Sequence, residues 1–235
     1  MKYLAIALSL LSLPLCAETD SSLSTTPESR TQKWWMPRHQ EKLEQKKNLG
    51  DVQLVFIGDS ITHAWENKGK EVWAKEYAPY KALNLGYSGD RTENVLWRIE
   101  NGEVDGISPK AIVMMIGTNN AGHRDEPSEQ TADGIKAILD LLEKKQPETK
   151  ILLLGIFPRG TTPEDPKRKL IDGTNKIIET YADNKRVFYL NINNVFLEED
   201  GTLSKQVMKD LLHPNPDQYQ VWADAIRPLL QKLME

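Results

Sequence analysis

The chain has very few cysteines and no surplus of basic residues. Cys16 is the only cysteine among 235 residues, and it lies in an N-terminal segment that we expect to be removed. A mature chain without cysteine has no disulfide, no thiolate metal site and no cysteine nucleophile. The net charge is −4 and the isoelectric point about 5.7, which argues against a nucleic-acid partner because phosphate binding needs a basic face.

Long hydrophobic runs are also missing, except at the N-terminus. The first residues, MKYLAIALSLLSLPLCAETD, combine Lys2 with an apolar run too short to span a bilayer and with small residues near its end. We therefore expect a signal peptide over residues 1–17, cleavage after Ala17, and a periplasmic or extracellular protein. Lipidation of Cys16 is the less favoured alternative, because the bulky Leu15 precedes it.

The segment after the signal peptide lacks apolar periodicity. Residues 18–33, ETDSSLSTTPESRTQK, are polar and rich in Ser and Thr, which predicts a flexible tether. No second linker and no internal repeat follow. Hydrophobic residues make up 39% of the chain, enough for one core, so residues 34–235 are expected to form a single domain.

Within this domain, short apolar runs alternate with amphipathic stretches. Runs of Val, Ile and Leu without polar alternation are typical of strands buried on both faces. The predicted strands are residues 53–57, 81–85, 111–116, 150–157 and 186–192. The predicted helices are residues 38–48, 71–77, 92–101, 128–145, 167–183 and 217–233. The alternation predicts an α/β fold with a parallel sheet, whose ligand site lies at the carboxyl ends of the strands.

Reactive residue types follow four of these predicted strands. Ser60 in Gly-Asp-Ser follows the first strand, Gly89 in Tyr-Ser-Gly-Asp the second, and Asn119 in Gly-Thr-Asn-Asn the third. After the fifth, across a longer loop, Asp-Leu-Leu-His-Pro supplies Asp210 and His213. Because the carboxyl ends of parallel strands share one edge of the sheet, we expect these side chains to lie together.

This set of residues suits acyl transfer. Ser60 is a candidate nucleophile that needs a base, and His213 is the candidate base because histidine titrates near neutral pH. Asp210 would hold the imidazole in one tautomer. The backbone N–H groups of Ser60 and Gly89 and the side-chain amide of Asn119 are candidate donors to an oxyanion.

The motifs GDS, YSGD, GTNN and DLLHP resemble the sequence blocks of the SGNH (GDSL) hydrolase superfamily. The segments LNLGYSGDRTENVLWRIENGE, MIGTNNAG and LLLGIFPRG are similar to its platelet-activating-factor acetylhydrolase-like branch. The resemblance covers residues 52–230, with Ile61 where the name motif has Leu. It implies a three-layer α/β/α sandwich with a five-stranded parallel sheet of the flavodoxin-like kind, no cofactor, and the roles given above for the same five residues. The related animal enzymes imply that a homodimer is possible.

Each motif alone also has a purely structural explanation. Gly-Asp-Ser occurs in turns that cap a helix, Asn tolerates left-handed turns, and Asp-x-x-His can be an acidic helix start. Only the joint pattern favours catalysis. The four histidines lack a ligand spacing such as His-Glu-x-x-His, so no metal site is expected.

Five further residues are pocket candidates because they are close in sequence to the motifs. These candidates are Asp59, His63, Trp65, Asn120 and His123. For His63 and His123, a surface position is the alternative.

Three other segments have two explanations each. Trp34 and Trp35 are expected in the core in preference to an exposed stacking surface. Residues 167–169, Lys-Arg-Lys, are expected on a solvated helix face. Residues 161–166 are either a mobile loop over the site or a plain surface connection.

The sequence therefore predicts an exported serine esterase for short acyl chains, acetyl above all, with a small-molecule or glycan ester as substrate. A long apolar lid segment, which a long-chain lipase would use, is missing. Two alternatives stay open: a lysophospholipase or thioesterase of the same fold, and a catalytically silent carbohydrate-binding protein.

Overall fold

Five short apolar segments form one parallel sheet, as predicted. In the computed structural model, which describes residues 23–235, the strand order is β2-β1-β3-β4-β5. The strands are β1 (Leu54–Gly58), β2 (Leu83–Gly86), β3 (Ala111–Met115), β4 (Lys150–Leu154) and β5 (Val187–Leu190). Every residue of β1, β2 and β3 is buried, because helices cover both faces. This strand order is the flavodoxin-like one, in which ligands bind where the order reverses, beside β1 and β3.

Helices connect the strands and cover the sheet. They are α1 (Trp35–Leu49), α2 (Ser60–His63), α3 (Lys70–Glu76), α4 (Thr92–Glu100), α5 (Thr118–Arg124), α6 (Ser128–Lys145), α7 (Pro166–Ile178) and α8 (Gln218–Met234). The six predicted helices are present, with ends shifted by a few residues. The short helices α2 and α5 were not predicted; each begins directly where a strand ends.

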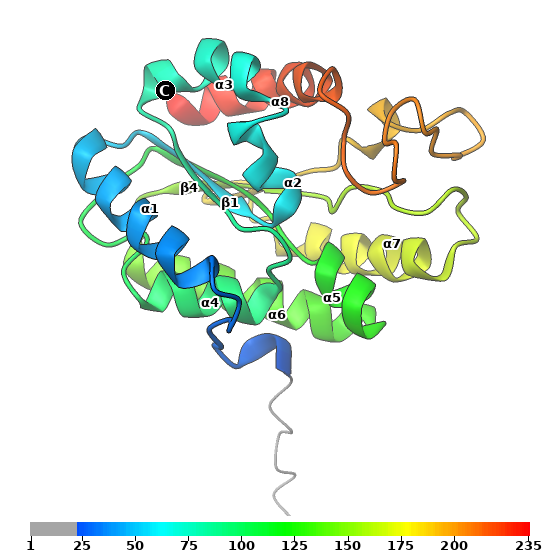
Figure 1. Cartoon of the computed structure of the whole chain (residues 1–235), viewed down its shortest axis with the longest axis horizontal. Coiled ribbons are helices and arrows are strands. Elements are labelled where there is room, and N and C mark those ends of the chain that lie inside the picture. The colour runs from blue at the N-terminus through cyan, green and yellow to red at the C-terminus, as the bar shows by residue number, and fades with distance from the viewer. Residues whose placement is uncertain (1–22) are drawn as a thin grey trace, which may run out of the picture.

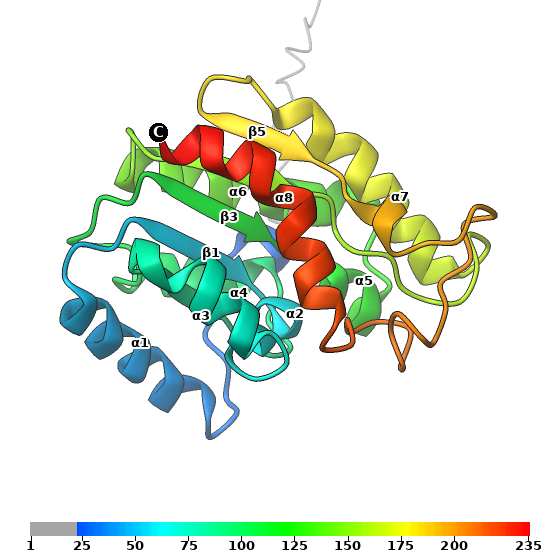
Figure 2. The same ribbon diagram turned by 90° about the horizontal axis from the view of Figure 1, so that it is seen from above.

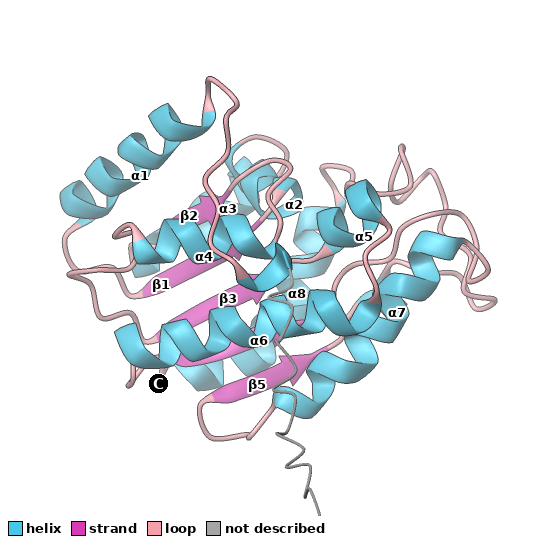
Figure 3. Ribbon diagram, turned by 90° about the horizontal axis from the view of Figure 1, so that it is seen from below, coloured by secondary structure: helices cyan, strands magenta, loops and turns pink. Residues whose placement is uncertain are grey.

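The helices form two outer layers around the sheet (Figure 1). Helices α3 and α8 lie over one face (Figure 2), and α4, α6 and α7 cover the other (Figure 3). Each layer encloses its own apolar cluster: Val95, Ile138 and Ile171 pack against one face of the strands, Trp65 and Trp222 against the other. The predicted three-layer α/β/α sandwich is therefore confirmed.

The segment before α1 packs against the domain. Residues 23–25 form a short 3₁₀ helix, η1 (Leu23–Thr25), which contacts α4 and α6. Ser24 is buried and hydrogen-bonds Glu126, and the Glu28 N–H donates to the Glu93 carbonyl (3.1 Å). The flexible tether predicted for residues 18–33 is thus wrong from residue 23 onward. Hydrogen bonds of polar groups hold this segment in place, and such contacts cannot be predicted from the pattern of apolar residues.

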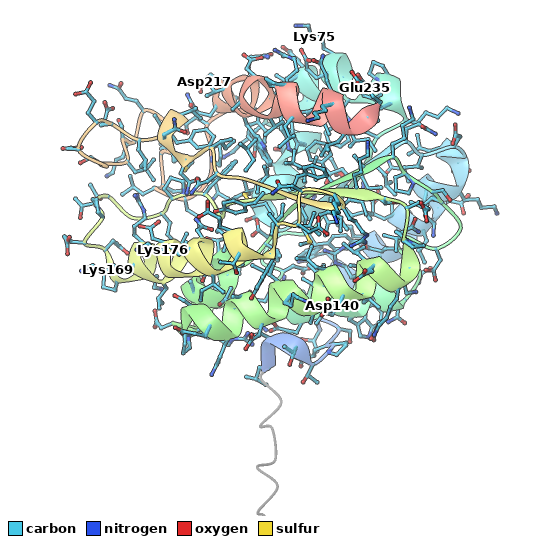
Figure 4. All side chains as sticks on the ribbon, turned by 180° about the vertical axis from the view of Figure 1, so that it is seen from behind. Lys75, Asp140, Lys169, Lys176, Asp217 and Glu235 are labelled. Atoms are coloured by element: carbon cyan, nitrogen blue, oxygen red, sulfur yellow. The ribbon has the colours of Figure 1, made fainter. Side chains whose placement is uncertain are left out.

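The predicted signal peptide over residues 1–17, with Cys16, lies outside the described residues. Within residues 23–235, no helix combines the length and apolar character needed to cross a membrane. Charged side chains lie on the outer faces of the helical layers, as Figure 4 shows for Lys75, Asp140 and Lys169.

Candidate active site

The carboxyl ends of β1, β2 and β3 bring the predicted motifs to one edge of the sheet. Gly58 at the end of β1 pairs with Gly86 of β2 on one side and with Met115 of β3 on the other. The chain therefore leaves three neighbouring strands at the same level. Helix α2, the turn after Gly86 and helix α5 begin there.

Ser60 is the first residue of α2. The carboxylate of Asp59 caps this helix by accepting from the Ile61 N–H (2.9 Å), and the Tyr219 hydroxyl of α8 donates to the Ile61 carbonyl (2.9 Å). Helix α2 crosses the end of β2 so closely that a Cβ at Gly86 would lie 2.2 Å from the His63 nitrogen. Glycine at that position is what allows α2 to present Ser60 at the sheet edge.

His213 joins Ser60 to Asp210. The His213 Nε2 lies 2.8 Å from the Ser60 Oγ, and its Nδ1 lies 2.7 Å from the Asp210 Oδ2. The other oxygen, Asp210 Oδ1, accepts from the N–H groups of Leu212 (3.1 Å) and His213 (2.8 Å). With Nδ1 protonated and bonded to the carboxylate, Nε2 is left as the acceptor that faces the hydroxyl.

The loop of Asp210 and His213 has an unusual backbone. Leu211 has a φ of +59°, a left-handed conformation that is uncommon outside glycine. Its carbonyl accepts from the Gly160 N–H (3.0 Å), which ties the loop to the segment after β4. This turn lets one carboxylate bind two backbone N–H groups and the imidazole at once.

The pKa values of Asp59 and Asp210 are shifted in opposite directions. Burial raises the pKa of Asp59 to about 7; the Ile61 N–H opposes this shift, and the charge of Asp90 adds to it. At Asp210, burial would also raise the pKa. The N–H of His213 and its imidazole outweigh burial, so the pKa of Asp210 is below its ordinary value.

Gly89 and Asn119 flank this cluster. Gly89 has a φ of +80°, and the Asp90 N–H donates to the Tyr87 carbonyl (3.1 Å), so residues 87–90 form a tight turn. The side-chain amide of Asn119, in the first turn of α5, donates one hydrogen to the Asp90 carbonyl (2.9 Å). A primary amide has a second N–H, which stays available to a ligand.

A buried ionic network lies under the turn of residues 87–90. Arg98 donates to the Asp90 carboxylate (2.8 Å) and pairs with Glu103, and its guanidinium lies 3.9 Å from the Tyr87 ring centroid. Trp35 Nε1 donates to the same Asp90 carboxylate (2.7 Å). The turn therefore rests on a buried network in which Arg98 forms ion pairs with both Asp90 and Glu103.

His63 and His123 lie at the margins of the cluster. His63 Nδ1 is 3.0 Å from the hydroxyl of Ser88, the residue before Gly89. Burial, with a smaller effect of Arg38, lowers the pKa of His63 to about 4 although Glu66 opposes the shift, so the ring is neutral near pH 7. His123 is exposed on one side only; the partial burial of its ring, followed by the charges of nearby arginines, lowers its pKa.

Two pocket candidates belong elsewhere. Trp65 is fully buried in the apolar cluster between the sheet and α8, with its ring centroid 4.6 Å from that of Tyr219. Asn120 is also fully buried; it accepts from the Thr92 N–H (3.2 Å) and donates to the Thr92 hydroxyl (3.0 Å). These residues support the structure and do not line a pocket. Asp59 is buried as the cap of α2.

The burial of the two N-terminal tryptophans and of the basic residues in α7 was predicted only in part. Trp35 is in the core, but Trp34 is 39% exposed. Arg168 is buried, contrary to the predicted solvated face, and donates to the carbonyls of Arg159 (2.8 Å) and Gly160 (2.9 Å). Because it binds the backbone before residues 161–166, Arg168 anchors the start of that loop.

Two arginines near the site were missed by the sequence reasoning. Arg159 Nη1 donates to the Thr118 carbonyl (2.8 Å), next to Asn119. Arg30 Nη1 donates to the Ser88 carbonyl (2.7 Å), next to Gly89. An isolated arginine in a polar stretch gives no sequence signal of such contacts. Within residues 23–235, no group of three His, Cys, Asp or Glu side chains is arranged to hold a metal ion.

The chain is similar to known acylhydrolases. The model of the GDSL-like lipase/acylhydrolase family matches residues 56–221. Platelet-activating factor acetylhydrolase IB subunit alpha1 of Bos taurus is 37% identical over 201 residues, which cover 85% of this chain and 84% of the relative.

Solved structures share the fold at lower identity. A GDSL-like lipase from Bacteroides thetaiotaomicron has a TM-score of 0.67 at 20% identity, over 83% of this chain and 97% of that one. An acetylxylan esterase from Geobacillus stearothermophilus has a TM-score of 0.59 at 16% identity, over 79% and 95% of the two chains. With the family model spanning most of the domain and the relatives covering most of both chains, the protein belongs to the GDSL-like lipase/acylhydrolase family.

Proposed function

We propose that the protein is a serine esterase with Ser60 as nucleophile, His213 as general base and Asp210 as the residue that orients the imidazole. The observation that supports this most strongly is the unbroken chain of contacts from the Ser60 hydroxyl through His213 to Asp210, at 2.8 and 2.7 Å. A serine hydroxyl is a poor nucleophile at neutral pH and needs a neighbouring base, itself held in position by a third group.

The reaction proceeds in two halves. Ser60 Oγ attacks the ester carbonyl while its proton passes to His213 Nε2. The N–H groups of Ser60 and Gly89 and the amide of Asn119 stabilise the oxyanion. Collapse expels the alcohol, which takes the proton from His213 and leaves the acyl group on Ser60. Water, activated by His213, then attacks the acyl-enzyme and releases the acid.

We infer that the acyl group is short, acetyl above all. The relatives at 37% identity are named acetylhydrolases, and one structural neighbour is an acetylxylan esterase. Charged side chains lie around Ser60: burial lowers the pKa of Arg159, and the charges of Asp165, Asp59 and Asp210 oppose this shift. A polar rim of this kind is suited to a polar alcohol group.

An O-acetylated carbohydrate is the alcohol that we favour. Trp34 is 39% exposed, and its ring centroid lies 6.4 Å from that of His63, at the rim of the site. The guanidinium of Arg30 lies 5.9 Å from the same ring. An exposed indole beside an active site offers a flat surface for the C–H face of a sugar, with a charged donor next to it.

An acetylated glycerolipid is the second candidate. The identity of 37% over 201 residues to a platelet-activating factor acetylhydrolase subunit favours it. The apolar N-terminal stretch of residues 1–17 supports export to the periplasm or beyond, where either substrate can be present.

Initial rates on a series of esters test the acyl preference. We expect p-nitrophenyl acetate to be turned over well above the octanoate ester, and Ser60→Ala to be inactive on both. Preference for octanoate would contradict the short-chain assignment. A folded wild-type protein that binds acetylated oligosaccharides and hydrolyses no ester would instead be a binding protein.

Matched substitutions test the alcohol. Trp34→Ala should raise KM for acetylated xylo-oligosaccharides and leave p-nitrophenyl acetate unaffected, whereas Met36→Ala, with a similarly exposed side chain (38%), should change neither. Faster release of acetate from a 2-acetyl ether phospholipid than from the oligosaccharide would favour the glycerolipid.

A further inference from the structure

Arg30 lies outside the four sequence motifs but contacts the turn of residues 87–90. Its Nη1 donates to the Ser88 carbonyl (2.7 Å) and to the Asp90 carboxylate (3.2 Å), 58 and 60 positions further along the chain. A Cβ built on Gly89 would lie 2.9 Å from the same Nη1. The guanidinium therefore packs directly against the Ser88–Gly89 peptide.

This peptide is the central one of the turn over residues 87–90. The turn closes with the Asp90 N–H on the Tyr87 carbonyl (3.1 Å), and a φ of +80° at Gly89 is the value that the third position of a type II turn needs. Type I and type II turns differ mainly in the orientation of this central peptide plane. A glycine there permits both orientations, so the turn itself does not fix the direction of the Gly89 N–H.

Arg30 fixes that direction. In a planar trans peptide the C=O and the following N–H point to opposite sides. A donor that holds the Ser88 oxygen on one side therefore aims the Gly89 N–H to the other. A charged donor on the carbonyl also polarises the peptide, which strengthens the N–H as a hydrogen-bond donor.

Both the guanidinium of Arg30 and the backbone of its segment are held in place by other groups. Asp90 accepts from Arg30, Trp35 and Arg98, so the carboxylate that anchors the guanidinium is fixed by two further groups. The backbone of the segment is fixed as well, because the side-chain amide of Asn94 donates to the Glu28 carbonyl (2.9 Å). The segment of residues 23–33 thus holds Arg30 in place.

We propose that Arg30 is a positioning residue for the oxyanion hole, acting through the Ser88–Gly89 peptide. The proposal rests on the proposed function, in which the Gly89 N–H binds the oxyanion. It gives the segment before α1 a part in turnover, although that segment carries no acid, base or nucleophile of the reaction.

Steady-state kinetics on p-nitrophenyl acetate test the proposal. Loss of one oxyanion donor lowers kcat by roughly 10²–10³, and a misaimed donor should cost less, so we expect Arg30→Ala to lower kcat by about 10- to 100-fold. KM should stay nearly unchanged, because the donor acts on the transition state. The control is Lys33→Ala, which removes an exposed cation from the same segment and should have wild-type kinetics.

Two further measurements separate positioning from folding. Arg30→Lys keeps the charge and one donor, and should recover part of kcat. Guanidinium chloride, added to Arg30→Ala at concentrations too low to unfold it, should also restore part of kcat. If Arg30→Ala lost activity only because its fold was disturbed, neither the lysine variant nor added guanidinium would restore kcat. The absence of both rescues would therefore overturn the proposal, whether or not Arg30→Ala is destabilised.

Failure of the inference is distinguishable from failure of the proposed function. A kcat of Arg30→Ala close to that of wild type, in a protein whose turnover still depends on Ser60, would overturn the inference alone. A rise in KM without a fall in kcat would assign Arg30 to substrate binding, which also overturns it. Absence of any turnover by the folded wild type would overturn the proposed function and the inference together.

Discussion

The imidazole of His213 lies 2.8 Å from the hydroxyl of Ser60, although 153 residues separate them in the chain. Ser60 is carried by a short helix directly after β1, and His213 by a loop just before α8. The loop owes its shape to Asp210, whose carboxylate binds two backbone N–H groups as well as the imidazole. One side chain thus contacts both the backbone of the loop and the imidazole of His213.

Asp210→Asn separates these two tasks. The Asn oxygen can still accept from the backbone, so the loop should keep its shape, but an amide cannot stabilise the imidazolium as a carboxylate does. We expect kcat to fall by about 10²–10⁴, as in other triads, with little change in thermal unfolding. Asp217→Asn, an exposed neighbour at the start of α8, is the control. A loss below about threefold would count against the role of Asp210.

The pH dependence of turnover should come from His213 and not from His63. Burial lowers the pKa of His63 to about 4, so this ring stays neutral over the working range. An imidazole must be neutral to accept the serine proton, and histidines as a class titrate between about pH 5 and 8. The rate kcat/KM should therefore fall towards pH 5 in wild type and equally in His63→Gln. A flat profile, or a limb that disappears in His63→Gln, would contradict His213 as the base.

Gly89→Ala should damage both activity and stability. Alanine at a φ of +80° costs about 1–2 kcal/mol, and its Cβ would press on Arg30. Displacing the Gly89 N–H should lower kcat by about 10²–10³.

The matched control is Gly106→Ala. Gly106 has a φ of +74°, open space around its Cα and no part in the site. It should lose similar stability, read from urea unfolding, and keep its kcat. Equal kcat values for the two variants would show that the turn of residues 87–90 does not contribute to the chemistry.

Asp59 should make the protein less stable as pH rises. Its folded pKa of about 7 lies above the ordinary value of 3.8, mainly because of burial, so the folded state holds a proton that the unfolded state releases between about pH 4 and 7. The free energy of unfolding should therefore decrease over that range by an amount on the order of 1–4 kcal/mol.

Asp59→Asn should remove this contribution to the slope, since Asn is neutral at every pH and can still accept from the Ile61 N–H. Urea unfolding at several pH values, on wild type and variant, measures the difference. The same slope in both proteins would show that Asp59 is ionised in the folded state at pH 4–7.

The sheet could be predicted from the sequence because buried parallel strands have a simple signature. Segments such as Ala111–Met115 are continuous apolar runs, and their ends mark where the motifs must meet. Closeness in sequence to a motif, in contrast, did not predict which residues lie near the site. Trp65 follows Ser60 by only five residues, but it lies in the 3₁₀ turn Ala64–Glu66 after α2, where its side chain is fully buried in the core.

Polar anchoring was the other feature that the sequence did not reveal. Residues 23–33 look like a linker because their contacts are made by Ser24, the backbone of Glu28 and Arg30, which follow no period. The left-handed Leu211 was missed for a related reason. Its conformation is imposed by the contacts of Asp210 with the backbone and not by its own residue type.

The most direct test of the account is to trap the acyl-enzyme. Wild type and Ser60→Ala are mixed rapidly with p-nitrophenyl acetate and quenched in acid, and their peptides are analysed by mass spectrometry. If Ser60 is the nucleophile, the peptide that carries it gains one acetyl group, formed with the burst of nitrophenol and absent from Ser60→Ala. Turnover without acetylation of Ser60, or near-normal turnover by Ser60→Ala, would contradict Ser60 as the nucleophile.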